Sequence, residues 1–278
     1  MCMVLIASVM SGAASAQTRV AMETRVHTLI DRASGHRFVV QVGVPTTYAR
    51  DRLRRYGVLY VLDGDKSFGL ARDVVDWLAW WGASEIPPLI VVGIGYGTTD
   101  ANWLQQRSRD LTPSQDRSKM WGNWPLAGGA AAFTAWVKTS LVPFVDSAYR
   151  VTPGDRVVAG VSFGGLYAVW AAVSDPVLFP RAIAVNPTFG WDSFRIRDLL
   201  RDRAAESKML PLALYLALGD KDQAPFHGPW HQMVAELAAL QFAQLRLITE
   251  VLPGETHISA WPIGLTHGLK ALYPKPSR

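Results

Sequence analysis

The stretch Val157-Val158-Ala159-Gly160-Val161-Ser162-Phe163-Gly164-Gly165 decides which fold this chain is expected to adopt. Residues 155–161 have the apolar, β-branched composition of a buried strand, and apolar side chains follow Gly165 at helical spacing. The pattern Gly-x-Ser-x-Gly between them predicts a sharp strand-to-helix turn, because the two glycines let neighbouring backbone pass close by. A serine on such a turn presents its hydroxyl away from the backbone, so Ser162 is the candidate nucleophile.

Apolar runs bounded by Gly, Pro or Asp continue this pattern on both sides of the serine. The expected strands are 37–44, 57–62, 89–94, 182–185, 212–218 and 245–251, and the expected helices are 68–81, 129–149, 193–203 and 230–240. Strands that alternate with helices indicate the α/β class, with a mainly parallel, doubly wound sheet flanked by helices. No repeat or linker divides the chain, so residues 17–278 are expected to form a single catalytic domain.

The amino-acid composition excludes several classes of site. The 278 residues are 49% hydrophobic, which suits one large domain with a buried sheet. Cys2 is the only cysteine, so cysteine nucleophiles, disulfides and thiolate metal sites are not expected. The formal net charge is +5, but the arginines are spread along the chain and form no stripe for nucleic acid.

The first residues resemble a secretory signal. Residues 2–10 are mostly apolar, and the small residues Ala14, Ser15 and Ala16 precede Gln17. This pattern predicts a signal peptide over residues 1–16 and a periplasmic or secreted protein, although no basic residue precedes the apolar run. The alternative is an N-terminus that packs on the domain or stays disordered, because the run is too short to span a bilayer and anchor the chain there.

A serine nucleophile needs a base, normally a histidine held in one tautomer by a carboxylate. The usual chain order in this architecture is serine, acid, histidine, which excludes His27 and His36. His257 lies in the loop that follows the strand 245–251, from which it can reach over the serine, so it is the expected general base. His267 falls within an expected helix, where a packing or surface role fits better.

Two further histidines, His227 and His231, have the i, i+4 spacing of a helical metal site. The glutamate of the zinc-protease pattern is absent between them, so no metal and no cofactor are expected.

The acid is expected in the segment Gly219-Asp220-Lys221-Asp222, just beyond the strand 212–218. Both aspartates cannot orient one imidazole. Asp222 lies further into the loop and is the preferred acid, which leaves Asp220 as a turn residue or helix cap.

The negative charge that develops on the ester oxygen needs hydrogen-bond donors. One donor is the backbone N–H of Phe163, which follows the nucleophile. The second is expected from the loop after the strand 57–62 and is assigned to the N–H of Asp65. The carboxylates of Asp63 and Asp65 could instead mark a metal site, but no histidine lies nearby in the sequence.

Residues 96–126 form a long segment with weak periodicity, and such insertions are usually functional or mobile. The segment follows a strand end on the side of the nucleophile, so it is interpreted as a wall of the cleft. Its candidate substrate-binding residues are Trp103, Arg107, Arg109 and Trp124. The alternative for each tryptophan is that it only seals the core.

Several stretches in combination resemble the putative esterase family of α/β-hydrolases, over about residues 24–273. They are Tyr60-Val61-Leu62-Asp63-Gly64-Asp65, Val91-Val92-Gly93-Ile94-Gly95-Tyr96, Arg107-Ser108-Arg109-Asp110-Leu111-Thr112-Pro113, Gly128-Gly129-Ala130 with Phe133, residues 160–165, residues 219–222 and His257. The first has aspartate where many members carry histidine. The resemblance implies an α/β-hydrolase fold and is strongest to the trilactone siderophore esterases. It places the acid third after the glycine, at Asp222. Because the acid varies in that branch, a Ser162–His257 dyad stays open.

These observations predict a serine carboxylic-ester hydrolase that works through an acyl-enzyme. Tryptophan rings in the segments 77–81 and 103–124 would suit aromatic acyl groups, and Arg107 or Arg109 would suit anionic oxygens, as in a catecholate siderophore. The alternatives are a general short-chain esterase, an acyltransferase that passes the acyl group to another acceptor, and a non-catalytic binding protein. The expected partner is a small-molecule ester; the oligomeric state is left open.

Overall fold

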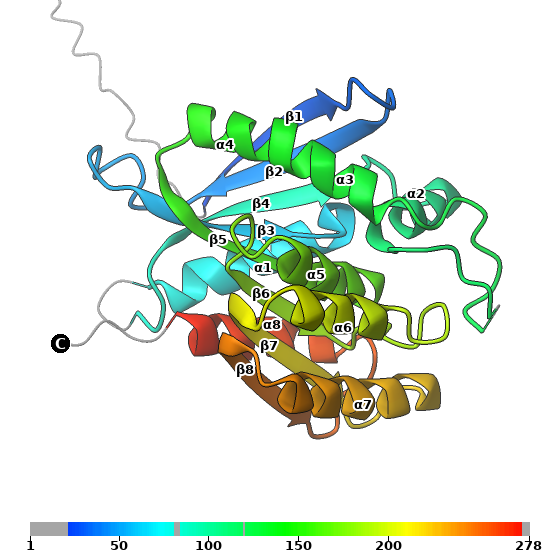
Figure 1. Cartoon of the computed structure of the whole chain (residues 1–278). Coiled ribbons are helices and arrows are strands. Elements are labelled where there is room, and N and C mark those ends of the chain that lie inside the picture. Colours follow the sequence, from blue (N-terminus) through cyan, green and yellow to red (C-terminus); the bar gives the residue numbers. More distant parts are fainter. Residues whose placement is uncertain (1–21, 81–83, 119, 274–278) are drawn as a thin grey trace, which may run out of the picture.

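Strands β1 to β8 form one sheet in the order β1-β2-β4-β3-β5-β6-β7-β8 (Figure 1). The computed structural model describes residues 22–80, 84–118 and 120–273, so the expected signal at residues 1–16 lies outside the described part. The strands are β1 (Glu23–Ile30), β2 (Arg37–Val44), β3 (Tyr56–Val61), β4 (Leu89–Gly95), β5 (Val151–Val161), β6 (Arg181–Val185), β7 (Met209–Gly219) and β8 (Ala243–Leu252).

The sheet is mainly parallel, as the sequence predicted. Strands β4, β3, β5, β6, β7 and β8 pair in parallel, while β2 pairs antiparallel to both β1 and β4. The parallel strands therefore end at one edge, on the right in Figure 1. We call it the carboxyl edge. Loops that leave this edge bring together side chains far apart in the sequence.

Strand β1 was not predicted. It pairs with β2 along its whole length, from Glu23↔Val44 to Ile30↔Arg37. As the outermost strand, β1 carries charged and polar side chains, and most of its residues are exposed. It therefore lacks the apolar run from which the other strands were predicted.

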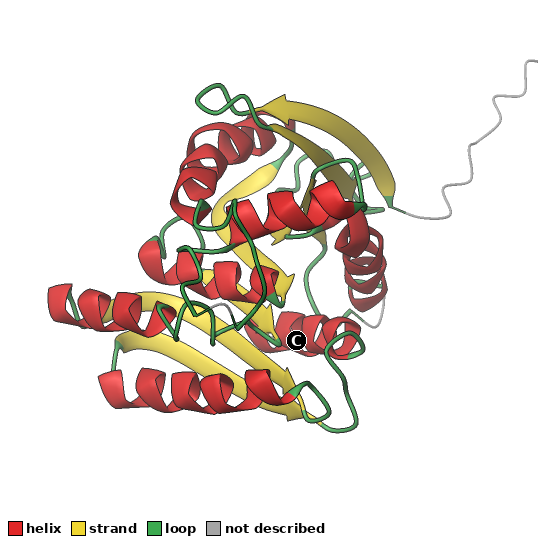
Figure 2. Ribbon diagram, turned by 90° about the vertical axis from the view of Figure 1, so that its right-hand side faces the viewer, coloured by secondary structure: helices red, strands yellow, loops and turns green. Residues whose placement is uncertain are grey.

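Helices cover both faces of the sheet (Figure 2). They are α1 (Gly64–Leu78), α2 (Ala101–Leu111), α3 (Ala130–Trp136), α4 (Val142–Ala148), α5 (Phe163–Ser174), α6 (Ile196–Glu206), α7 (Ala224–Leu240) and α8 (Ala260–Leu272). Successive side chains of β3 point to opposite faces, as the pleat requires. Leu59 and Val61 pack with α1 and α8, whereas Val58 and Tyr60 pack in the core under α3 to α7. No helix in the described ranges is both long and apolar enough to cross a bilayer.

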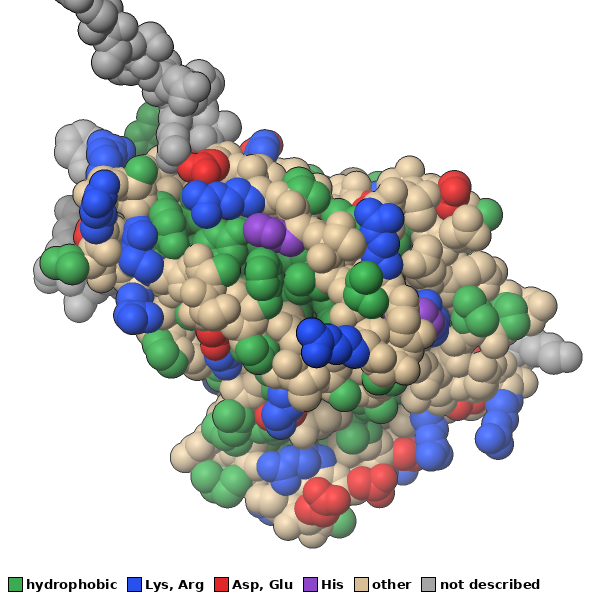
Figure 3. Space-filling model, turned by 90° about the horizontal axis from the view of Figure 1, so that it is seen from above, with side chains coloured by type: hydrophobic (Ala, Val, Ile, Leu, Met, Phe, Trp, Pro, Cys, Tyr) green, Lys and Arg blue, Asp and Glu red, His purple; other side chains and the backbone are tan. Residues whose placement is uncertain are grey.

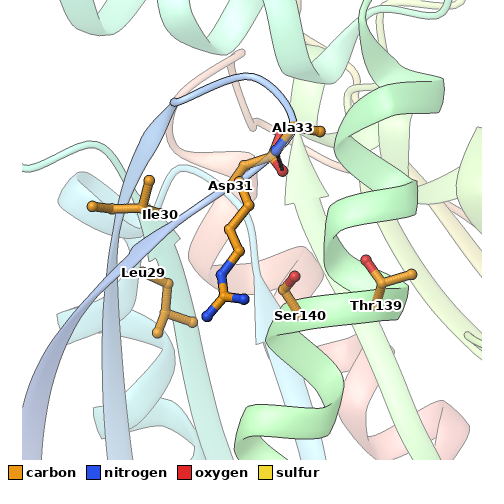
Figure 4. A pocket seen from close by; sticks show the side chains of 7 residues that line it. Leu29, Ile30, Asp31, Ala33, Thr139 and Ser140 are labelled. Carbon is orange, nitrogen blue, oxygen red and sulfur yellow. Dashed lines mark hydrogen bonds between the residues drawn. The ribbon is translucent and has the colours of Figure 1, made fainter.

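The helix expected over 129–149 has a π-helical turn, η1 (Val137–Leu141), between α3 and α4. Pro143, the second residue of α4, has no N–H to donate four residues back, which favours a wider turn at this point. Between η1 and the end of β1 lies a pocket of about 460 Å³, whose lining includes Ser140 and Leu29 (Figure 4).

Residues 96–126 contain a helix that the periodicity did not reveal. Helix α2 begins after Asp100, whose carboxylate accepts a hydrogen bond from the N–H of Asn102 at 2.8 Å. The helix has a low apolar content because its buried face includes Arg107, Ser108 and Asp110. This composition explains the weak signal. The described residues of the following segment, 112–118 and 120–129, lead to α3 without a helix or strand.

Candidate active site

Ser162 lies on the turn from β5 into α5, with φ 60° and ψ −122°. This conformation is strained for a residue with a side chain and persists only where the surroundings hold it. A Cβ atom at Gly160 would lie 2.5 Å from the carbonyl carbon of Gly164, so only glycine fits where the strand and the helix cross. The N–H of Ser162 also donates to the carbonyl of Val185 in β6 at 3.1 Å. The strand, turn and helix thus have the form that the Gly-x-Ser-x-Gly pattern predicted.

His257 and Asp222 meet at the carboxyl edge. Nδ1 of His257 lies 3.0 Å and 3.1 Å from the two carboxylate oxygens of Asp222. The Asp222 side chain is fully buried, and the His257 side chain is 19% exposed. With Nδ1 donating its hydrogen to this carboxylate, Nε2 is left as the acceptor that a general base needs.

Asp220 has a different task. Its carboxylate accepts a hydrogen bond from the N–H of Gly254 at 2.6 Å, and its own N–H donates to Leu252. A Cβ atom at Gly219 would lie 2.4 Å from the carbonyl oxygen of Glu255. The loop after β7 is therefore packed against the loop after β8, and Asp220 helps to hold the segment on which His257 lies.

Asn186 is a positioning residue that the sequence reasoning missed. It follows β6, is fully buried, and has φ 43°. Its Oδ1 accepts the N–H of Gly219 at 2.7 Å, and its Nδ2 lies 3.2 Å from the carbonyl oxygens of both Thr256 and His257. One amide side chain thus connects the loop that holds the acid to the loop that holds the base.

The Ser162 hydroxyl lies 3.4 Å from Oγ1 of Thr188, and the N–H of Thr188 donates to the Ser162 carbonyl. Within the described residues, no hydrogen bond joins this hydroxyl to His257. Catalytic hydrogen bonds often tighten only when substrate binds, so this geometry is compatible with a serine and base pair.

The two amides expected to hold the oxyanion lie at the N-termini of helices. Phe163 is the first residue of α5 and Asp65 the second of α1. Neither N–H donates to a protein acceptor in the part of the chain that the structure describes, as expected for the first turn of a helix. The Asp65 carboxylate is engaged elsewhere, with the N–H groups of Tyr96 and Gly97 at 2.6 Å and 2.8 Å.

Arg107 is buried and makes a bidentate ion pair with Asp63. Its Nε and Nη2 lie 2.8 Å and 2.7 Å from the two carboxylate oxygens. The guanidinium also lies 5.1 Å from the centre of the Phe163 ring and 4.9 Å from that of Trp103. The pair joins α1, α2 and the serine turn. This geometry favours a role in positioning over the substrate contact predicted for Arg107, and it gives Asp63 a partner other than a metal.

Arg109 is paired as well. Its guanidinium makes two hydrogen bonds to Asp110, at 2.7 Å and 2.8 Å, and its side chain is 15% exposed. Burial raises the pKa of the Asp110 carboxyl, although the hydrogen bonds from Arg109 oppose that change.

Aromatic rings line the approach to the serine and the histidine. The Trp124 ring meets Phe163 edge to face at 5.7 Å, and Trp121 meets Phe226 at 5.0 Å. Phe226 in turn lies 4.4 Å from the imidazole of His257. Residues 112–129, which carry Trp121 and Trp124, therefore lie beside both the nucleophile turn and the base, where the sequence placed a wall of the cleft. Trp103 is only 7% exposed.

Comparison with known proteins agrees with this geometry. The family described as putative esterase matches residues 32–244. The chain is 27% identical to the ferri-bacillibactin esterase BesA of Bacillus subtilis (strain 168), over 79% of this chain and 80% of that protein. It is 30% identical to a siderophore enterobactin esterase of Emericella nidulans, over 60% of this chain and 58% of that protein.

Among solved structures, an IroE-like serine hydrolase from Shewanella oneidensis superposes with a TM-score of 0.81. The two are 27% identical, and the match covers 90% of this chain and 80% of the other. The α/β-hydrolase fold expected from the sequence is confirmed.

The two neighbouring aspartates should differ sharply in their effect on catalysis. We expect Asp222→Asn to lower kcat by up to about ten-thousandfold, because the imidazolium loses its buried counter-charge. Asp220→Asn keeps an oxygen that can accept the Gly254 N–H and should change kcat little. Steady-state kinetics on a soluble ester compare the two. A greater loss for Asp220→Asn would show that the acid is misassigned, and no loss for either would indicate a dyad.

Replacement of Arg107 tests whether it positions the site. Arg107→Gln leaves the 5%-exposed carboxylate of Asp63 without its counter-charge, which typically costs about 3–5 kcal/mol of stability. We expect a lower unfolding temperature by calorimetry. Arg201→Gln breaks an exposed bidentate pair with Glu236 and serves as the control, with no change expected. A raised KM at an unchanged unfolding temperature would instead favour direct contact with substrate.

Proposed function

This chain belongs to the putative esterase family, and from the arrangement of its site we propose that Ser162, His257 and Asp222 form the triad of a serine esterase that cleaves siderophore-type esters. The observation that carries the assignment is the imidazole of His257 held by Asp222 at the carboxyl edge where the Ser162 turn emerges. A histidine fixed in this tautomer, beside a serine on a strained turn, suits acyl transfer.

The proposed reaction has two halves. Oγ of Ser162 attacks the ester carbonyl carbon while Nε2 of His257 takes its proton, and the N–H groups of Phe163 and Asp65 hold the oxyanion. His257 then returns the proton to the departing alcohol, which leaves the acyl group on Ser162. Water, deprotonated by His257, then attacks the carbonyl carbon of this acyl-enzyme. The bond to Oγ of Ser162 breaks, His257 returns the proton to Oγ, and the carboxylic acid is released.

The aromatic rings beside the site support an aromatic acyl group. Trp121 and Trp124 are partly exposed and supply rings on which a catechol-type ring could stack. The relatives named as esterases of ferri-bacillibactin and enterobactin point to the same class of ester. We propose that Trp124 contacts the acyl group directly. Arg107, Arg109 and the buried Trp103 are proposed to support the residues that contact the substrate.

Comparing substrates tests the ester class. A catecholate trilactone, with and without iron, should be hydrolysed with a higher kcat/KM than p-nitrophenyl butyrate or a feruloyl ester. Chromatography of the released acids measures this preference. Equal rates on all esters would favour a general esterase. The serine mechanism itself would be unaffected by that result, because covalent modification of Ser162 tests it separately.

We also propose that residues 1–16 direct export, so that the protein acts in the periplasm or outside the cell. The sequence of small residues before Gln17 supports this proposal. Mass spectrometry of protein from the periplasm of its host should find a mature chain that begins at or near Gln17. An intact Met1 in a cytoplasmic fraction would contradict it.

Ser162→Ala should lower turnover by several orders of magnitude, because it removes the nucleophile. The fold should stay intact, because the change removes only one oxygen from a half-buried turn. A fluorophosphonate probe should label the wild type and fail to label Ser162→Ala. Residual activity above a few per cent would rule out this nucleophile.

A pair of histidine variants provides the matched comparison. We expect His257→Ala to be almost as damaging as Ser162→Ala, whereas His267→Ala should be nearly silent. His267 lies in α8, where its Nδ1 is 2.9 Å from Glu250 and its side chain is 45% exposed. The reverse order of effects would mean that the wrong base has been chosen.

A further inference from the structure

Two tryptophans and a leucine are exposed at the edge of the sheet opposite to the carboxyl edge. Trp77 and Trp80, at the end of α1, are 69% and 58% exposed, and Leu53, in the loop between β2 and β3, is 94% exposed. The two tryptophan rings meet edge to face at 5.0 Å, so they form one aromatic pair. Exposed apolar side chains that gather in one place commonly mark an interaction site.

Arginines lie on one side of this pair, in the loop between β2 and β3. Arg50, Arg52, Arg54 and Arg55 are all exposed in the loop between β2 and β3. Arg50 and Arg54 line a hollow of about 670 Å³ together with Trp80. Figure 3 shows Lys and Arg side chains gathered at the left end of the molecule, the end at which this loop lies in Figure 1.

Acidic groups offset this charge only in part. Asp51 and Asp76 line the same hollow, and the Asp51 carboxylate accepts the N–H of Arg54 at 3.1 Å. Asp73 is paired with Arg72 at 2.7 Å. Four arginines against Asp51 and Asp76 leave the local charge positive. We call the residues Arg50, Arg52, Leu53, Arg54, Arg55, Trp77 and Trp80 the Trp–Arg face.

The position of the Trp–Arg face separates it from the chemistry. The loop between β2 and β3 leads into the start of β3, and Leu89, the first residue of β4, lines the same hollow. Ser162 follows the end of β5, which runs parallel to β3. A partner bound to the Trp–Arg face would therefore leave the carboxyl edge open to substrate.

We propose that the Trp–Arg face binds the surface of a bilayer that contains anionic lipids. Tryptophan rings favour the boundary between headgroups and acyl chains, and guanidinium groups pair with lipid phosphates. Leu53 between Arg52 and Arg54 provides the same combination, an apolar group to insert beside cations. This proposal does not depend on the proposed esterase function.

Binding of the full chain to vesicles tests the proposal. Vesicles of phosphatidylcholine with an equal part of phosphatidylglycerol are compared with pure phosphatidylcholine by co-sedimentation. One variant carries Trp77→Ser with Trp80→Ser, and another carries Arg50→Gln, Arg52→Gln and Arg54→Gln. The matched control carries Ile30→Ser with Arg32→Gln, an exposed apolar residue and an exposed arginine at the opposite edge of the sheet.

The wild type should bind the anionic vesicles and bind pure phosphatidylcholine at least about tenfold more weakly. Both variants of the Trp–Arg face should lose about tenfold or more of the affinity for anionic vesicles, with the control unchanged. Higher salt should weaken the wild type more than the arginine variant. Hydrolysis of a soluble ester should be the same in all four proteins, which also reports that each is folded.

Three results would overturn the proposal. The first is a wild type that binds neither kind of vesicle, which would favour a protein partner for this face. The second is equal binding to both kinds of vesicle. The third is variants that bind like the wild type, because binding would then come from other residues such as the apolar run at 2–10.

Discussion

The site depends on the hydrogen bonds of one buried side chain, the amide of Asn186. The side-chain amide accepts a hydrogen bond from the N–H of Gly219 and donates toward the carbonyls of Thr256 and His257. The backbone N–H of Asn186 donates to the carbonyl of Ala217 in β7. A buried donor or acceptor left without a partner costs roughly 1–3 kcal/mol, so these contacts strongly favour one arrangement of the loops. The loops that carry Asp222 and His257 are thereby held together by a residue outside the proposed triad.

A second buried group holds the other half of the site. Asp63 follows β3 in a left-handed conformation and makes a bidentate ion pair with Arg107 of α2. The guanidinium of Arg107 also packs against the Phe163 ring. A buried ion pair adds little net stability by itself, because both charges have left water. Its fixed geometry does connect the start of α1 with the start of α5, where the N–H groups of Asp65 and Phe163 have no acceptor among the described residues. Both halves of the site thus depend on polar groups that only the folded chain brings together.

The sequence predicted what is encoded locally. Ser162 could be found because its turn needs glycine on both sides within five residues, and His257 because its loop follows a strand that is visible as an apolar run. The preference for Asp222 over Asp220 rested on loop position, and the structure gives the reason: Asp220 is engaged with Gly254. Which of them matters for catalysis stays a prediction.

What the sequence could not predict lies in long-range packing. Asn186 stands in an Asn-Pro-Thr segment that is typical of an ordinary turn, and only its contacts across three loops reveal its task. Arg107 suggested a substrate contact because nothing near it in sequence indicates Asp63, 44 residues away. Strand β1 and helix α2 were missed because both have polar sequences: β1 is an edge strand paired only with β2, and the buried face of α2 carries Arg107, Ser108 and Asp110.

Gly219 has a consequence for how proteins with this fold diversify. Any larger residue there would run into the backbone at Glu255, so the segments that carry the acid and the base have no freedom to lengthen independently. Residues 112–118 and 120–129 contain no helix or strand, and they bring Trp121 and Trp124 beside the site. Insertions and deletions can therefore accumulate in that one segment and change the ester that is accepted, while the chemistry stays the same.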